Sequence, residues 1–304
     1  MNQPHLTKPK ATYIKPSPGV TELLTTLRHG GKQLFLASNS SFDFVDVGMT
    51  FLVGSDWRAR FDVVIVSADK PNFFSGKHRR PFRQVDPETG RPMMHKVHSL
   101  KSDGIYAAGG VESLAQMTGW GAGDVLYCGD SLWADLVEAH RRNGWHTAAI
   151  INELEDELKV IESPEYHELL LKAATLEELL RVIQEEVFRL PYFHDGAVEK
   201  LPRRTSADDR LIDAVESILK DVKEKMRVIF NTQFGSVFRA RHGPTLFASS
   251  LYRHCDLYTA RLENLNSYPN VGMRRFYPTA SRPLPHEKIV SNGRMATAIK
   301  DGGK

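Results

Sequence analysis

Two acidic residues follow an apolar segment near the middle of the chain. The segment 125–128 has the composition of a buried strand and is followed by Gly129-Asp130, with a second acid, Asp135, five residues further on. Open α/β sheets bind ligands at the carboxyl ends of their strands, and carboxylates there can hold hard divalent cations. The pattern therefore predicts a metal ligand at Asp130.

Two further polar clusters follow apolar runs earlier in the chain. Ser38-Asn39-Ser40 follows one run and Lys70 follows the next. A hydroxyl and an amide suit the non-bridging oxygens of a phosphate, an ammonium offsets developing charge, and a carboxylate holds a divalent cation. If the strands are parallel, the clusters meet at one edge of the sheet and indicate phosphoryl transfer.

Each cluster also has a simpler interpretation when it is taken alone. Ser38 to Ser40 could cap a helix, Lys70 could be a solvated loop lysine, and Asp130 could cap the helix that follows it. Their joint order and spacing favour a phosphohydrolase ancestry over coincidence. Ancestry of this kind does not by itself predict activity.

Strand and helix patterns alternate over the first half of the chain. The apolar runs 33–37, 62–67, 125–128 and 146–151 have the length and composition of strands, with helical spacings of apolar residues between them. This alternation predicts an α/β fold with a parallel sheet. Proline and glycine punctuate residues 75–106, for which we expect a β-hairpin excursion.

Helical patterns dominate after about residue 153. The expected helices cover 153–161, 165–190, 206–239 and 244–268. One apolar stripe runs from Leu211 to Ile229. We expect a partial α/β core over 1–152, a helical region packing on it over 153–290, and a disordered tail over 291–304.

Composition narrows the class of protein. The 304 residues carry 40 Lys and Arg against 37 Asp and Glu, a net charge of +3, which does not favour nucleic acid as a partner. Cys128 and Cys255 fit a reducing compartment, and the apolar runs are too short for a membrane span. We expect a cytoplasmic location, and a mitochondrial one stays open.

At the polar clusters the chain resembles the haloacid dehalogenase superfamily of phosphohydrolases. That superfamily carries a strand-end Ser or Thr, then a Lys, then a Gly-Asp-x-x-x-x-Asp acid pair, in the order found here. Four segments are similar to the cytosolic purine 5′-nucleotidase family and its domain-containing relatives: Leu34 to Ser40, Ala68 to Phe74, Arg80 to Arg83 and Phe234 to Arg239. The resemblance covers residues 15 to 287 approximately.

The resemblance implies a Rossmann-like core that hydrolyses purine nucleoside monophosphates with Mg²⁺, through an aspartyl-phosphate. By position, Ser38 and Asn39 would hold the phosphate and Lys70 would neutralise it. Asp130 would ligate Mg²⁺, and Asp135 would support that ligand or Lys70. Family analogy also implies IMP or GMP as substrate and a possible homo-oligomer.

The sequence departs from the family pattern in one respect. The family's nucleophile and general acid/base are two aspartates of an Asp-x-Asp-x-Thr motif on a central first strand, and no Asp-x-Asp occurs in these 304 residues. The family's cap insert is also missing. We therefore expect a central gap between the strands ending at Ser38 and Asp130, and a truncated chain that is inactive alone.

Two alternatives remain open at this stage. The first is a non-catalytic interaction or scaffold protein, in which the helical region docks to a partner or to another copy of the chain. The second is a normal enzyme whose gene has been recorded incompletely. An in-frame Asp-x-Asp-x-Thr sequence upstream of Met1 would decide for the second.

Overall fold

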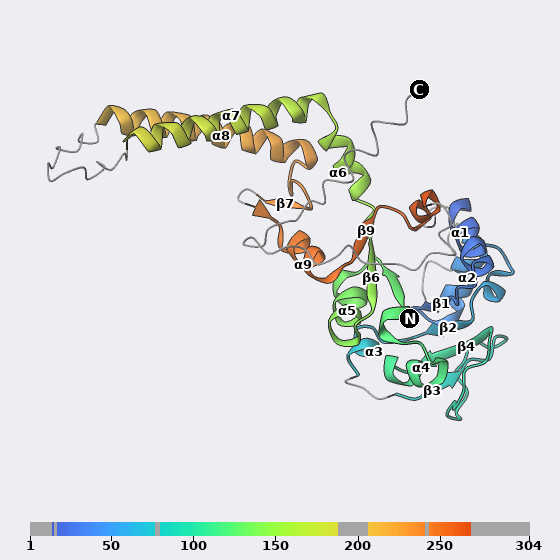
Figure 1. Ribbon diagram of the computed structural model, residues 1–304. Coiled ribbons are helices and arrows are strands. Elements are labelled where there is room, and N and C mark those ends of the chain that lie inside the picture. The colour runs from blue at the N-terminus through green and yellow to red at the C-terminus, as the bar shows by residue number, and fades with distance from the viewer. Residues whose placement is uncertain (1–13, 15–16, 77–79, 188–205, 241–242, 269–304) are drawn as a thin grey trace, which may run out of the picture.

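The computed structural model describes residues 14, 17–76, 80–187, 206–240 and 243–268. Within these residues strands and helices alternate in an α/β body, and two long helices extend away from it (Figure 1). Both larger sheets contain parallel strands, so the predicted α/β class is confirmed. The tail expected over 291–304 lies outside the described residues.

The first sheet has four strands in the order β1-β2-β4-β3. Their bounds are Phe35–Ala37 (β1), Val63–Val66 (β2), Gly104–Ala108 (β4) and Phe82–Gln84 (β3). β1, β2 and β4 are parallel, and β3 is antiparallel to β4. The strands predicted at 33–37 and 62–67 are confirmed. β4 was not predicted: it ends beyond the hairpin excursion expected over 75–106, and it pairs with β2 as well as with β3.

The second sheet has three parallel strands in the order β5-β6-β9. Their bounds are Leu126–Gly129 (β5), His146–Ile150 (β6) and Leu257–Thr259 (β9). β9 corrects the expectation of one helix over 244–268, because α9 (Leu246–His254) ends before it. The Thr147 hydroxyl of β6 donates to the carbonyl of His254, 107 residues away, at 2.7 Å.

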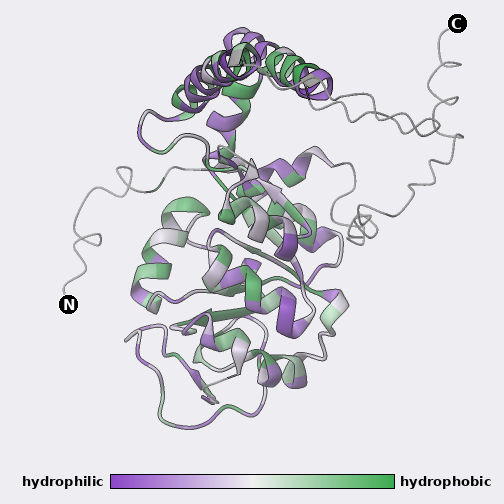
Figure 2. Ribbon diagram, turned by 90° about the vertical axis from the view of Figure 1, so that its left-hand side faces the viewer, coloured by the Kyte–Doolittle hydropathy of each residue, from purple (hydrophilic) through white to green (hydrophobic). Residues whose placement is uncertain are grey.

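Helices cover both faces of the first sheet. Successive residues of β2 point to opposite faces, so each face of this strand packs against a different set of helices. Val64 and Val66 pack in one buried cluster, which includes residues of α1 (Pro18–His29), α2 (Phe42–Leu52) and η3 (Trp57–Arg60). Val63 and Ile65 pack in the other, with residues of α3 (Asn72–Ser75), α4 (Val111–Thr118) and α5 (Val137–Asn143). Figure 2 shows these apolar strands between the helices of the body.

Aromatic side chains connect the two sheets. Within the described residues β1 and β5 belong to separate sheets, with no ladder between them. The ring of Phe35 in β1 lies 6.0 Å from that of Tyr127 in β5, 5.8 Å from Trp145 and 5.3 Å from Trp120. The central gap expected from the sequence stays a prediction.

The two long helices form a hairpin, which we call the arm. It consists of α7 (Pro164–Val187) and α8 (Ser206–Phe230), and α6 (Leu154–Ile161) precedes it. A small apolar core joins the helices through Ala173, Leu180, Ile212, Val215, Leu219 and Val222. The predicted stripe from Leu211 to Ile229 is divided, since Val215 and Val222 are buried against α7 while Leu211 and Ile218 are exposed. No described helix is both long and apolar enough to span a membrane.

The chain returns from the arm to the body through short elements. These are β7 (Arg239–Ala240), β8 (Gly243–Pro244), α9, β9 and η6 (Leu262–Ser267). The buried Glu157 of α6 anchors the start of this segment by accepting hydrogen bonds from the Ser236 hydroxyl at 2.9 Å and the Val237 N–H at 2.6 Å. The predicted helix over 206–239 ends earlier than expected, at Phe230. The division of the chain near residue 152 stays a prediction.

Candidate functional site

The polar residues predicted from the sequence lie at the carboxyl ends of β1, β2 and β5. Asn39 follows β1, Lys70 follows β2, and Asp135 follows β5 in the short π-helix η5 (Leu132–Leu136). Asn39 contacts Lys70 and Lys70 contacts Asp135, so the three strand ends are joined by side chains. The parallel arrangement thus brings the clusters to one edge, as expected for an α/β sheet.

Lys70 lies in a tight loop between β2 and α3. Ser67 and Asp69 have positive φ angles of 47° and 64°, and the Lys70–Pro71 peptide bond is cis. The Asn39 side chain holds this loop: its Oδ1 accepts from the Lys70 N–H at 2.6 Å, and its Nδ2 donates to the Lys70 carbonyl at 2.9 Å. Both ends of the Asn39 amide are therefore engaged in positioning Lys70.

The Lys70 ammonium and the Asp135 carboxylate form a buried ion pair. Nζ lies 2.6 Å from Oδ1, and the two side chains are 12% and 4% exposed. Nζ also donates to the Ala37 carbonyl at 3.1 Å and to the Tyr127 hydroxyl at 3.2 Å. A buried charge is tolerated when it is paired and its remaining donors are satisfied. Here each of the three ammonium hydrogens has an acceptor.

Tyr127 completes this network, and the sequence analysis did not identify it. Its hydroxyl donates to Asp135 Oδ1 at 3.3 Å while accepting from Lys70. Burial, followed by the neighbouring Asp135 carboxylate, raises the pKa of Tyr127 well above its ordinary value, so the phenol stays protonated. The sequence feature that could have identified Tyr127 is its position in a buried strand, two residues before Gly129.

Gly129 is required by the close approach of Asp135. A Cβ atom at residue 129 would lie 2.6 Å from the Asp135 Cβ, which is too close for any side chain. The second carboxylate oxygen, Oδ2, accepts from the Ser131 N–H at 3.2 Å, and the Ser131 hydroxyl caps η5 by accepting from Ala134. The Gly-Asp sequence therefore shapes the turn that carries Asp135.

Ser38 and Asp130 are less engaged than the residues around Lys70. The Ser38 hydroxyl accepts from the Ser40 N–H at 3.1 Å, and Asp130 is exposed. Among the residues that the structure describes, no three His, Cys, Asp or Glu side chains are grouped as a metal ion would need. Asp130 thus presents one carboxylate at this edge, because Asp135 is bound to Lys70.

The side chains at this edge suit the binding of an oxyanion. Burial raises the pKa of the Cys128 thiol to about 11, so it stays protonated near neutral pH and is a poor nucleophile. The edge offers the Lys70 ammonium, the Ser38 hydroxyl and the exposed Asp130 carboxylate. Together they suit a phosphate group and a cation that accompanies it.

Comparison with known proteins gives consistent matches over nearly the whole chain. A model described as the 5′ nucleotidase family matches residues 3–289. The chain is 39% identical over 288 residues to 5′-nucleotidase domain-containing protein 2 of Rattus norvegicus, covering 94% of this chain and 48% of the relative. The protein of the same name from Homo sapiens is 38% identical over 288 residues, covering 94% and 51%.

A more distant relative comes from Dictyostelium discoideum. This 5′-nucleotidase domain-containing protein is 35% identical over 282 residues, which cover 90% of this chain and 44% of the relative. The chain therefore spans about half the length of the curated relatives that it matches.

Proposed function

The chain belongs to the 5′ nucleotidase family, and from this membership we propose that it binds the phosphate of a nucleoside monophosphate at the ends of β1, β2 and β5. The observation that carries the proposal is the Lys70–Asp135 pair, with 2.6 Å between Nζ and Oδ1. This pair holds an ammonium group at the edge where the three strand ends meet. A purine base, as in IMP or GMP, rests on the resemblance alone.

Each residue of the site then has a distinct role in holding phosphate. The Ser38 hydroxyl accepts from Ser40, so its proton can serve a phosphate oxygen. Lys70 offsets the negative charge of the phosphate. Asn39 positions the backbone of Lys70, and Asp135 positions its ammonium group. A phosphate oxygen would replace one of the neutral acceptors of Nζ, such as the Ala37 carbonyl at 3.1 Å.

Hydrolysis of the haloacid-dehalogenase type needs groups that these residues do not provide. A carboxylate oxygen must form a bond to phosphorus while the ester P–O bond breaks, and an acid must protonate the departing alcohol. The sequence contains no Asp-x-Asp, and the Asp135 carboxylate is bound to Lys70. By themselves the 304 residues therefore bind phosphate monoesters without hydrolysing them at an appreciable rate.

The edges of β1 and β5 suit one further parallel strand that would carry those carboxylates. The Ala37 carbonyl of β1 accepts from Lys70 Nζ at 3.1 Å, and the Tyr127 hydroxyl, whose proton points to Asp135, is an alternative donor 3.5 Å away. A backbone N–H from an added strand could take the place of these donors and release Lys70 toward the substrate. Such a strand would come from residues outside the described ranges or from another chain.

Mg²⁺ is the cofactor that the family resemblance implies. Mg²⁺ usually takes one or two carboxylates together with substrate oxygens and water. No three possible ligands are grouped among the described residues, so these residues do not fit a complete metal site by themselves. Asp130 is the proposed protein ligand, and a second one would have to accompany the added strand.

Two measurements separate phosphate binding from hydrolysis. Calorimetry with inorganic phosphate should detect binding that Ser38→Ala weakens by about tenfold or more, the loss of one hydrogen bond to a charged group. Ser41→Ala is the matched control, because the exposed Ser41 makes no side-chain capping bond. Absence of phosphate binding, or equal binding by both variants, would refute the proposed site.

Phosphate release from IMP and GMP with Mg²⁺ tests the second part of the proposal. The wild-type chain and Asp130→Asn should both remain at the background rate. Robust turnover by the wild-type chain that disappears in Asp130→Asn would show that the 304 residues are catalytically complete, and would overturn the proposed inactivity.

A further inference from the structure

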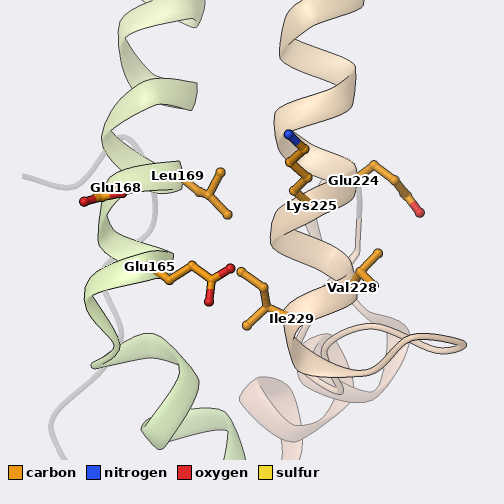
Figure 3. A pocket seen from close by; sticks show the side chains of 7 residues that line it. All are labelled: Glu165, Glu168, Leu169, Glu224, Lys225, Val228 and Ile229. Carbon is orange, nitrogen blue, oxygen red and sulfur yellow. The ribbon is translucent and has the colours of Figure 1, made fainter.

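The arm returns to the body through one short segment of the chain. Figure 3 shows the base of the arm, where α7 begins, α8 ends, and Leu169 and Ile229 line a groove between the two helices. After α8 the chain passes through α9 to β9, which pairs with β6 as the third strand of the second sheet. Figure 1 shows α9 and β9 beside α5 and β6 at this junction. The contacts of α9 and β9 therefore hold the end of the arm on the body.

Three histidines meet at this junction, although they lie far apart in the sequence. His140 belongs to α5, His146 begins β6, and His254 ends α9. The ring centroids of His140 and His254 are 6.1 Å apart. Oδ2 of Asp256 lies 3.5 Å from Nδ1 of His146 and 4.0 Å from Nδ1 of His140. The three rings and this carboxylate therefore form one cluster.

Asp256 also fixes the start of β9 on β6. Its Oδ2 accepts from the Thr147 N–H at 2.9 Å, and its own N–H donates to the Thr147 carbonyl at 3.0 Å. Thr147 is buried, and its hydroxyl donates to the carbonyl of His254 at 2.7 Å. The residues that respond to protonation are thus the ones that hold β9 in place, or lie next to them.

We propose that His140, His146, His254 and Asp256 form a pH-sensitive latch, which holds β9 against β6 at neutral pH and releases it in mild acid. Histidine is the side chain whose ordinary titration range lies between pH 5 and 8, so a cluster of histidines responds to small changes of pH. The inference concerns β9 and the arm, and it does not depend on the proposed phosphate site.

The charges around the latch balance while the histidines are neutral. They are two arginines and two carboxylates: Arg141, Arg253, Glu138 and Asp256. Glu138 already forms an ion pair with Arg141 at 3.1 Å. Each proton that binds a histidine therefore adds a positive charge that these four groups no longer balance. The rings of His140 and His254 would repel each other if both were protonated.

Burial acts in the same direction as charge. Desolvation, and then the neighbouring His140, lowers the pKa of His254, so the closed latch favours the neutral imidazole. Nδ1 of His140 is buried and has no hydrogen-bond partner among the residues that the structure describes. A proton on that nitrogen would have the Asp256 oxygen at 4.0 Å, which is beyond the reach of a hydrogen bond.

Proton linkage gives the sign and the size of the effect. Opening returns His254 to water, where histidine has a pKa of about 6.5, so below that pH the open latch binds more protons than the closed one. The latch is therefore fully closed above about pH 6.5 and weakens as the pH falls below it. One proton taken up on opening raises the opening equilibrium by up to about tenfold for each pH unit.

Hydrogen exchange of the full chain, followed by mass spectrometry at pH 8 and pH 5.5, tests the latch. The quantity compared is the protection factor of amides in β6 and β9, which corrects for the effect of pH on the chemical exchange rate. In the wild type this protection should be about tenfold lower at pH 5.5 than at pH 8. Strand β2 is the internal reference, because it belongs to the other sheet and should keep its protection.

Two variants should change the ratio of protection at the two pH values in opposite directions. In His140→Gln/His254→Gln the new side chains bind no proton, so the fall should shrink to about twofold or less. Asp256→Asn keeps an oxygen for the Thr147 N–H but removes the carboxylate that faces two of the rings, so the fall should exceed that of the wild type. His29→Gln is the matched control, because His29 is exposed at the end of α1.

Circular dichroism at pH 8 should show that all variants are folded. A purely structural defect would lower protection at both pH values and leave their ratio unchanged. Equal protection of β9 at both pH values in the wild type would overturn the proposal, as would a fall that the double histidine variant keeps in full. A fall shared equally by β2 and β9 would mean acid unfolding of the whole body, and would overturn it as well.

Discussion

Loss of one partner from the Lys70–Asp135 pair should destabilise the protein far more than loss of both. The two side chains are 12% and 4% exposed, so Asp135→Leu leaves the Lys70 ammonium buried without a counter-charge. Removing one member of a buried ion pair costs about 3 to 5 kcal/mol, whereas replacing both by apolar residues is often neutral. Lys70 keeps Ala37 and Tyr127 as acceptors, so we expect about 3 kcal/mol for Asp135→Leu.

Urea unfolding, followed by tryptophan fluorescence, measures this effect in a double-mutant cycle. The four proteins are the wild type, Lys70→Met, Asp135→Leu and the double variant, which should lie within about 1 kcal/mol of the wild type. Arg141→Met is the control, because Arg141 is 68% exposed in its pair with Glu138 and such surface pairs contribute less than about 1 kcal/mol. If the two single losses add to within about 0.5 kcal/mol, the side chains are not coupled and the reasoning about this pair is wrong.

Three further outcomes follow from the site and its surroundings. Gly129→Ala places a Cβ 2.6 Å from that of Asp135, so it should lower the free energy of unfolding in urea by about 1 to 3 kcal/mol. In a Cys255→Ala background, Cys128 should react with a thiol reagent far more slowly at pH 8 than a free cysteine does. The reaction rate should rise as the pH approaches the Cys128 pKa of about 11, whereas rapid labelling at pH 8 would contradict the burial of this thiol. Burial, and then a neighbouring histidine, lowers the pKa of His254, so protonation favours the unfolded chain. Thermal stability should therefore be full above the ordinary histidine pKa of about 6.5 and fall as the pH decreases below it, and His254→Gln should reduce that dependence; an unchanged pH profile would count against it.

The positions of Ser38, Lys70 and Asp130 were predictable because each follows an apolar run of strand length. Parallel pairing alone then brings the ends of those runs to one edge. β4 was harder to recognise, because it directly follows a segment rich in proline and glycine that indicates turns. β9 has three residues and pairs with β6 more than 100 positions earlier, so its strand character depends on a tertiary contact.

The contacts between the site residues depend on geometry that residue types do not specify. An asparagine at a strand end can bind a ligand or a backbone, and only the fold shows that Asn39 binds the backbone of Lys70. The stripe from Leu211 to Ile229 is a similar case. Its spacing predicts an amphipathic helix. Which of its residues face α7 and which face solvent depends on where α7 lies, and the spacing does not give that position.

Strand β6 receives its second neighbour late in synthesis, because the whole arm is translated between β6 and β9. Until Leu257–Thr259 emerges from the ribosome, one edge of β6 has no partner from this sheet, and the Thr147 N–H and hydroxyl lack Asp256 and His254 as acceptors. Closing so long a loop costs only slightly more than closing a short one, since each doubling of length adds about 0.6 kcal/mol. The arm should therefore tolerate shortening by whole helical turns, whereas release of a nascent chain before residue 259 would leave an aggregation-prone edge.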